Sequence, residues 1–138
     1  MAAALTTSRP AFYQPALSLK AAGHPSGLNS DRMGEIVTGA DDVNQCIYII
    51  LTTPRGSDPQ RPLFGSDIYR YIDYPVNSAR PYIAREVIAA LGRDEPRIRV
   101  VRVNVTLSDT AAMQCEVEWT WADSVAGAEI YSTGGFAL

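Results

Sequence analysis

The stretch GRDEPRIRVVRVNVTL, residues 92–107, decides the fold because a helix ends in it and the most β-prone run of the chain begins. Pro96 lacks a backbone N–H and disfavours helical backbone at Glu95, so the helix cannot continue through it. Glu95 and Arg97 flank the resulting stiff corner, which suits bidentate recognition of a partner. The alternative interpretation is a solvent-exposed pair that contributes ~0–1 kcal/mol.

A strand over residues 98–107 follows the corner. Apolar residues alternate with polar ones after residue 100, whereas Ile98 and Val100 have the opposite phase, which predicts a bulge near Val100 and Val101. Residues 108–110 form the expected turn, and residues 113–121 show the cleanest alternation in the chain, so the two strands predict a hairpin. A weaker third strand over residues 128–133 precedes a glycine tail, completing a predicted antiparallel sheet of three strands.

The most regular helical pattern lies just before the corner. Asn77 or Ser78 is the expected N-cap, Pro81 is expected in the first turn, and Gly92 is the expected C′ residue. The apolar stripe of this helix contains Ile83, Val87, Ala90 and Leu91, and it is widened by Ala84 and Ile88. Together with the sheet it predicts an α+β fold in which helices cover one face.

An earlier helix is predicted from an N-cap at Asp41 or Asp42 to about Thr53, because the following Pro54 disfavours helical backbone there. Residues 54–65 contain three prolines and two glycines and therefore predict a shaped loop, with Phe64 as its apolar anchor. One or two helical turns are expected within residues 66–74. Residues 1–35, rich in alanine, proline and glycine, predict an extended arm, and residues 36–138 a single domain.

The composition narrows the function. Fifteen acidic and twelve basic residues in mixed order give a net charge of −3, without the basic patch that nucleic acid or an anionic membrane requires. No apolar run approaches the ~18 residues of a membrane span, and no signal peptide is visible, so we expect synthesis in a cytosol. Cys46 and Cys115 are then expected to be reduced core residues, with a disulfide as the alternative.

Catalytic and cofactor motifs are sparse. His24 is the only histidine and lies in the arm, so no catalytic triad or zinc cluster can be assembled around it. No phosphate-binding loop or dinucleotide fingerprint occurs, and no cofactor or metal is expected. Hydrolysis of a glycoside needs two suitably spaced carboxyl groups. Acids near the central loop, Asp58, Asp67, Asp73, Glu86 and Glu95, offer candidates without any role-specific spacing.

Two segments resemble a known family. DDVNQCIYIILTTPRGSDPQRPLFGSDIYRYID, residues 41–73, and EPRIRVVRV, residues 95–103, are similar to the phage baseplate wedge family typified by gp25 and gpW. The resemblance covers about residues 34–105. It rests on three motifs in the family's order, namely the helix end at Leu51-Thr52-Thr53, the loop Arg61-Pro62-Leu63-Phe64-Gly65 and the corner Glu95-Pro96-Arg97.

The resemblance implies a structural role in a contractile phage tail. Glu95, Pro96 and Arg97 would engage the helical core bundle of neighbouring wedge proteins, and Arg61 and Phe64 would also bind partners. The sheet would be a template for the first ring of the tail sheath protein, whose terminal arms would add strands to it. Either the strand after the corner or a strand at residues 129–133 would be the receiving edge, because unpaired edges invite such pairing; an edge covered by the N-terminal arm is the alternative.

The resemblance further implies a virion protein of the tail baseplate, present in six copies and assembled in the host cytoplasm. Tail tube, hub or a second wedge protein are the candidate partners of the arm. Two alternatives accompany this interpretation. One is a lysozyme-like peptidoglycan hydrolase of the baseplate, and the other is the equivalent subunit of a bacterial type VI secretion baseplate.

Overall fold

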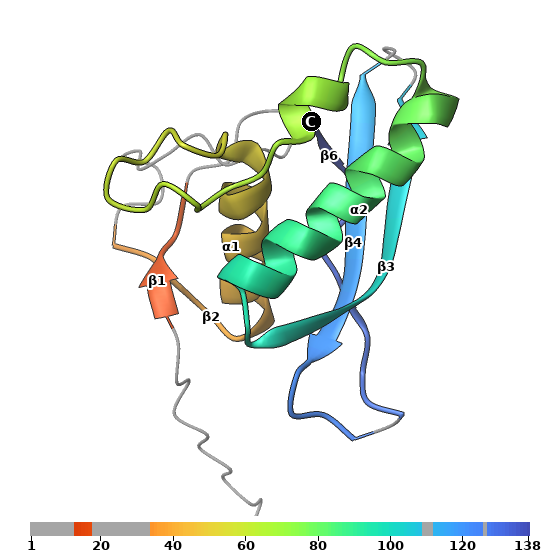
Figure 1. Cartoon of the computed structure of the whole chain (residues 1–138). Coiled ribbons are helices and arrows are strands. Elements are labelled where there is room, and N and C mark those ends of the chain that lie inside the picture. The colour runs from red at the N-terminus through yellow and green to blue at the C-terminus, as the bar shows by residue number, and fades with distance from the viewer. Residues whose placement is uncertain (1–12, 18–33, 109–111, 126) are drawn as a thin grey trace, which may run out of the picture. The chain divides into compact units, whose positions relative to one another are not determined.

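The computed structural model describes residues 13–17, 34–108, 112–125 and 127–138. The chain divides into two compact units, residues 1–45 and residues 46–138, and helix α1 (Ala40–Thr52) contains the boundary. Figure 1 shows the elements of both units. The described residues form helices and antiparallel sheets, which confirms the predicted α+β class.

The first unit contains a two-stranded ribbon. Strand β1 (Tyr13–Pro15) pairs antiparallel with β2 (Ile36–Thr38). The side-chain amide of Gln45 acts as a further backbone partner, because it donates to the Pro15 carbonyl oxygen and accepts from the Leu17 N–H, each at 2.9 Å. Part of the segment predicted to be an extended arm is therefore a strand, which the sequence did not indicate.

The main sheet lies in the second unit. Strand β3 (Ile98–Leu107) runs antiparallel to β4 (Met113–Trp121), and the register shifts between Val100 and Arg102. This irregularity confirms the predicted bulge. It brings the apolar residues before and after it to the same face of the sheet, as the change of phase required.

The last part of the chain differs from the prediction. The third strand is only β5 (Tyr131–Ser132), and a further strand, β6 (Phe136–Ala137), follows the expected glycine tail. Both pair with β4. Between them, Thr133 bonds Val117 through its N–H and its hydroxyl group, so the edge of β4 stays occupied while the chain passes through the glycines.

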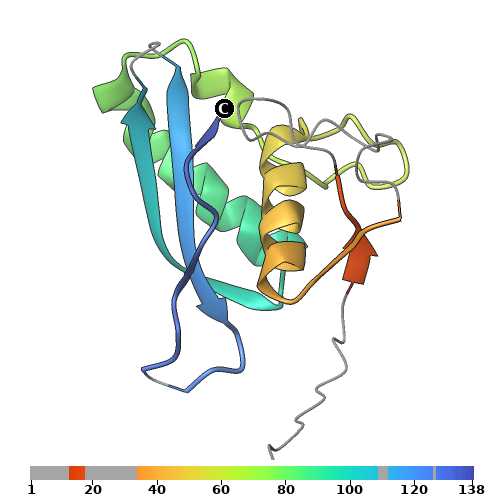
Figure 2. The same ribbon diagram turned by 180° about the vertical axis from the view of Figure 1, so that it is seen from behind.

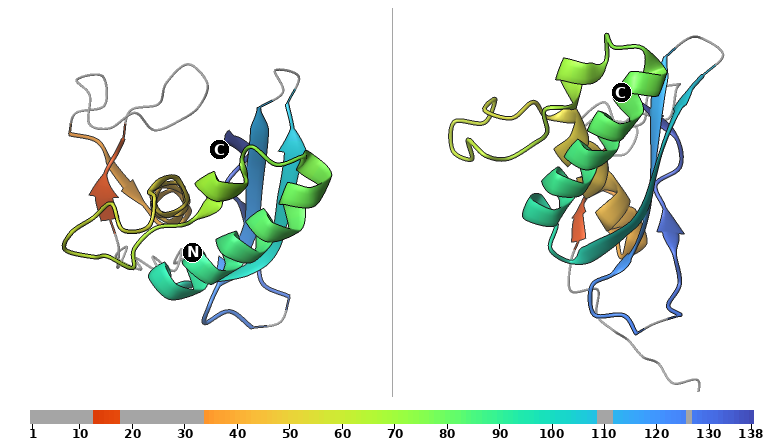
Figure 3. Two further views of the ribbon diagram at one scale, coloured as in Figure 1. Left: turned by 45° about the horizontal axis from the view of Figure 1, so that its top comes forward. Right: turned by 45° about the vertical axis from the view of Figure 1, so that its right-hand side comes forward.

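Helix α2 (Val76–Asp94) packs on one face of this sheet. The opposite face is turned towards the viewer in Figure 2, and Figure 3 shows the helix crossing the strands obliquely. Burying each large aliphatic side chain in this layer contributes ~1.5–3 kcal/mol. The fully buried residues of α2 and β4 are Ala79, Ile83, Val87, Ala90, Leu91, Cys115, Val117 and Trp119.

The helices begin earlier than predicted. Asp41 and Asp42 lie within the first turn of α1 and do not precede it. The Pro75 carbonyl oxygen accepts the first N–H bonds of α2, so the expected caps Asn77 and Ser78 are already helical. Pro81 is consequently inside the helix and not in its first turn.

The end of α2 also lies beyond the prediction. Gly92 is helical and does not adopt a left-handed conformation, and the helix continues to Asp94. Glu95 is the C-cap residue, and its N–H donates to the Leu91 carbonyl oxygen at 2.9 Å. Pro96 is therefore the residue that ends the helix, because it removes the next donor.

Two properties of the described residues agree with the composition. Neither of the long helices there is apolar along enough of its length to cross a membrane. Cys46 and Cys115 form no disulfide within the described residues, and only Cys115 is fully buried. Burial raises the pKa of the Cys115 thiol to about 12, so it remains protonated at neutral pH.

Candidate interaction site

The corner after α2 is closed by its own ion pair. The Arg97 guanidinium donates to both carboxylate oxygens of Glu95, from Nε at 2.5 Å and from Nη2 at 2.7 Å. Its Nη2 also lies 3.4 Å from the Cys46 sulfur. The Arg97 carbonyl oxygen accepts the Ala122 N–H, which attaches the corner to the end of β4. The backbone and the side chains at this corner are therefore held from several sides.

Burial of the pair changes what each residue can do. Glu95 is only 4% exposed, whereas 18% of the Arg97 side chain is exposed. The alternative of a solvent-exposed pair is therefore wrong. Glu95 faces Arg97 and not the solvent, so it positions the guanidinium, and Arg97 is the member of the pair that retains accessible surface.

The loop before η2 (Ile68–Tyr71) is joined to the same end of α2 through Gly65. Asp94 accepts the Gly65 N–H at 3.0 Å, and Arg93 Nη2 donates to the Gly65 carbonyl oxygen at 2.7 Å. Gly65 has a φ of +100°, and a Cβ there would collide with the Thr53 carbonyl oxygen. Since Asp94 directly precedes Glu95, the loop and the corner meet at one end of α2.

A second arginine cluster holds the other end of the loop. The Arg55 guanidinium bonds Glu86 at 2.7 Å and Asp67 at 3.2 Å, and Glu86 also accepts the Asp67 N–H. The Arg55 Nε is buried without a partner among the described residues. The sequence did not indicate this cluster, nor the contacts of Arg93 and Asp94, because the partners lie 12 to 31 residues apart and share no motif.

The tip of the loop presents a stacked arginine. The Arg61 guanidinium carbon lies 4.1 Å from the centre of the Phe64 ring, and Arg61 Nε bonds Asp58 at 3.0 Å. The Gln60 N–H and then Arg61 lower the pKa of the exposed Asp58 carboxyl. Phe64 is partly buried, more than its neighbours Pro62 and Leu63, and its role as the apolar anchor of the loop stays a prediction beside the glycine and arginine contacts. Leu63 beside it is 68% exposed.

The candidate acids for hydrolysis are engaged elsewhere. Asp58, Asp67, Glu86 and Glu95 each form an ion pair with an arginine. Asp73 lines an open pocket that includes no other acidic side chain. A glycosidase needs two carboxyl groups on opposite sides of a substrate, one of them free to give up a proton, whereas four of these five carboxyl groups are already paired with arginines.

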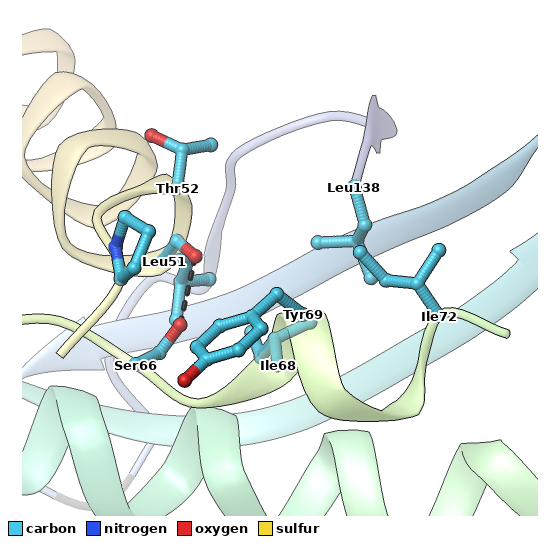
Figure 4. A pocket seen from close by; sticks show the side chains of 8 residues that line it. Leu51, Thr52, Ser66, Ile68, Tyr69, Ile72 and Leu138 are labelled. Atoms are coloured by element: carbon cyan, nitrogen blue, oxygen red, sulfur yellow. Dashed lines mark hydrogen bonds between the residues drawn. The ribbon is translucent and has the colours of Figure 1, made fainter.

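An apolar pocket of about 120 Å³ lies between the end of α1, η2 and the C-terminal residue (Figure 4). The Ser66 hydroxyl group in it donates to the Leu51 carbonyl oxygen at 2.8 Å, so this hydroxyl is committed to the fold. The other lining residues are Thr52, Pro54, Ile68, Tyr69, Ile72 and Leu138. The pocket contains no carboxylate side chain, cysteine or histidine.

No metal site is present in the part of the chain that the structure describes, since no three suitable side chains gather there. His24 lies outside the described residues. The predicted binding residues Arg61, Phe64, Glu95 and Arg97 thus form two groups, joined through Gly65 and the end of α2. Such an arrangement can present an arginine from a stiff backbone to a protein partner.

Comparison with known proteins gives a family match. The family model described as baseplate wedge protein gp25 matches residues 37–124, well over half of the chain. No curated protein matches the sequence.

Solved structures with a similar fold include two chains from baseplates and one crystal structure. A crystal structure from Geobacter sulfurreducens, provisionally named a tail lysozyme, is 26% identical with a TM-score of 0.62, covering 76% of this chain and 96% of that one. A chain in the post-contraction baseplate of pyocin R2 is 32% identical with a TM-score of 0.55, covering 69% and 96%. A chain in the baseplate of the anti-feeding prophage shares the fold, with 16% identity, a TM-score of 0.58 and coverage of 72% and 82%.

Proposed function

The chain belongs to the baseplate wedge protein gp25 family, and on this premise we propose that it joins the baseplate wedge to the first ring of the tail sheath. The family match supports a structural subunit of a baseplate, and the connection to the sheath is our proposal. We propose its place in the virion as the tail baseplate, in six copies that assemble in the host cytoplasm. No cofactor takes part in this role.

The observation that carries the proposal is the closed Glu95–Arg97 pair at the end of α2. Binding sites in stable assemblies rely on arginines whose geometry is set before the partner arrives. Glu95 and Cys46 hold the Arg97 guanidinium, and Pro96 stiffens the backbone between the pair. In our proposal, the exposed part of Arg97 contacts the helical bundle of the wedge proteins.

The loop tip supplies a second contact. Arg61 is held through its Nε by Asp58 and by the Phe64 ring, and 63% of its side chain remains exposed. Exposed Leu63 lies beside them. A guanidinium next to an aliphatic side chain is typical of residues that dominate protein interfaces. We assign this contact to a wedge, hub or tube protein.

The sheet provides the connection to the sheath. Strand β3 pairs only with β4 among the described strands, which leaves its other edge available for a strand from the sheath protein. In this proposal the corner attaches the subunit to the wedge, and the sheet edge sets the register of the first sheath subunits.

A peptidoglycan hydrolase of the baseplate is the second candidate, favoured by the likeness to the Geobacter sulfurreducens protein. The arginine partners of four of the five candidate acids speak against it. Purified chain that cleaves peptidoglycan, and loses this activity in the Glu86→Gln and Glu95→Gln double variant, would establish the hydrolase. A secretion-system baseplate is the third candidate and is distinguished by the genes and particles in which the chain occurs.

The test of the wedge contact is incorporation of variants into baseplates. The Glu95→Gln/Arg97→Met double variant removes the guanidinium without leaving a buried charge, so the chain folds but is expected to be missing from purified baseplates. Arg85→Ala, at an exposed arginine on α2, is the matched control and should be incorporated normally. Cryo-electron microscopy of the particles then locates the subunit. Normal incorporation of the double variant would refute the role of Arg97.

A further inference from the structure

The outer edge of β3 has its backbone groups directed away from the sheet. The Val117 carbonyl oxygen bonds Thr133, and the Met113 carbonyl oxygen bonds Leu138, so both face the far side of β4. Their partners across the ladder are Val103 and Leu107. In an antiparallel pair, such residues turn their own N–H and C=O groups outward as well. Val105, midway between them, does the same, which gives three donors and three acceptors on one edge.

The opposite edge of the sheet offers a shorter and interrupted row of backbone groups to a further strand. Strands β5 and β6 have two residues each, and two glycines separate them. Between the strands, the Thr133 hydroxyl replaces a backbone group in the bond to Val117. Short and interrupted edges are poor templates for an added strand. Of the two edges that the sequence left open, β3 is therefore the one built to receive a strand.

The surroundings of the β3 edge specify the chemistry of its occupant. A groove of about 670 Å³ runs beside it, lined by Arg80, Pro81 and Ala84 of α2, by residues 103–106 of β3 and by Glu116. Ile88 follows Ala84 by one helical turn and is 54% exposed, although the sequence predicted both in the core stripe. A strand added here would place alternate side chains against this apolar part of α2.

On the other face, the edge strand β3 carries two arginines, while Glu116 and Glu118 lie on β4 behind it. Arg99 and Arg102 are exposed on β3. Arg102 lies 3.9 Å from Glu118, a long distance for an ion pair, so this exposed pair is weak. Arg99 forms no ion pair within the described residues. Residues directly opposite on neighbouring strands interact most strongly, and opposite charges there are favourable. Acidic side chains on the arriving strand would complete these pairs.

We propose that the β3 edge binds an extended segment in which apolar side chains, facing Ala84 and Ile88, alternate with acidic side chains, facing Arg99 and Arg102. This inference rests on the proposed strand addition and names the kind of segment that it requires. The six-residue straight part of β3 after the bulge, residues 102–107, accommodates three apolar contacts on the α2 side, and the segment has to continue past the bulge to face Arg99. The charge of the segment sets its register and excludes basic strands.

The test uses the full chain and two labelled eight-residue peptides, one alternating valine with glutamate and the other alternating valine with lysine. Fluorescence anisotropy should show at least ~10-fold tighter binding of the glutamate peptide, a difference of ~1.4 kcal/mol. The Arg99→Glu/Arg102→Glu variant should reverse this preference. Ile88→Asp should weaken binding, whereas Ile130→Asp, at an isoleucine of similar exposure near β5, should not. Equal binding of both peptides would overturn the inference.

A proline variant separates this inference from the proposed function. Val103→Pro removes an outward N–H, so it should block sheath assembly on baseplates that contain the subunit and also abolish peptide binding. If Val103→Pro blocks sheath assembly but the unchanged chain binds the glutamate and lysine peptides equally, strand addition at β3 stands and the proposed chemistry of the segment is refuted. If the sheath assembles normally on Val103→Pro baseplates, addition at β3 is itself refuted. Circular dichroism of each variant verifies that the chain is folded.

Discussion

The Glu95–Arg97 pair predicts a large coupling in a double-mutant cycle. Glu95 is almost fully buried and receives two short bonds from one guanidinium. Arg97→Met leaves a buried carboxylate without its partner, and Glu95→Gln leaves a guanidinium that faces a neutral amide. The double variant Glu95→Gln/Arg97→Met contains no charge at this position. The single changes should therefore be costly and the double change mild.

The structure sets the size of each effect. Removing one member of a fully buried pair costs ~3–5 kcal/mol. Because 18% of the Arg97 side chain reaches solvent, we expect about 3 kcal/mol for Arg97→Met, at the lower end of this range, and about 2 kcal/mol for Glu95→Gln, below it, since the partly exposed guanidinium still faces an amide oxygen. The double variant should cost about 1–2 kcal/mol, so the coupling free energy is at least ~2 kcal/mol.

Urea unfolding of the full chain, followed by tryptophan fluorescence at pH 7, measures these free energies. The exposed pair Arg102 and Glu118 is the matched control, with a distance of 3.9 Å and 67% of the Arg102 side chain exposed. The corresponding cycle there should give less than ~0.5 kcal/mol. If the single effects at Glu95 and Arg97 simply add, the pair does not hold the corner and the proposed positioning role of Glu95 fails.

Three further predictions concern the fold. Gly65→Ala should destabilise the chain by ~2 kcal/mol or more, because the left-handed backbone and the Thr53 carbonyl oxygen both oppose a Cβ; an unchanged urea midpoint would contradict the described loop. Deleting Val101 should remove the bulge and leave Ile98, Val100 and Val103 on the same face in unbroken alternation, so the loss of stability should stay below the ~1.5–3 kcal/mol of one misplaced large side chain; a larger loss would show that the bulge itself stabilises the sheet. The pKa of Cys115 in the folded state is raised to about 12, so the folded state retains a thiol proton that the unfolded state loses above about pH 9. The free energy of unfolding should therefore fall between about pH 9 and pH 12, by up to ~1.4 kcal/mol per pH unit. This fall should be smaller in Cys115→Val, and identical pH profiles of the two proteins would refute the assignment.

The closed corner changes how the predicted binding residues are understood. Glu95 and Arg97 were expected to engage a partner together, whereas the structure directs Glu95 inward. The carboxylate therefore acts on a partner only through the guanidinium that it holds. Whether Arg97, Arg61 and Phe64 contact wedge proteins stays a prediction, and the incorporation experiment tests it.

Local signals in the sequence sufficed for the elements whose pattern is periodic. The helix before Pro96, the hairpin and the bulge near Val100 were all predictable, because side-chain alternation and the missing proline donor act within a few residues. The ends of the helices were less predictable, since the Pro75 carbonyl could start α2 without the expected side-chain caps. Strand β6 was missed because a two-residue strand after two glycines has no periodicity.

By itself, the sequence determined the α+β class, the position of the corner and, through its three ordered motifs, the family. Only the tertiary structure decided that Glu95 is buried, that Gly65 joins the loop to the end of α2, and that β3 pairs with β4 alone among the described strands. The physical reason is range. Backbone preference and periodicity act between near neighbours, whereas burial, ion pairing and strand order depend on residues that meet only after the chain has folded.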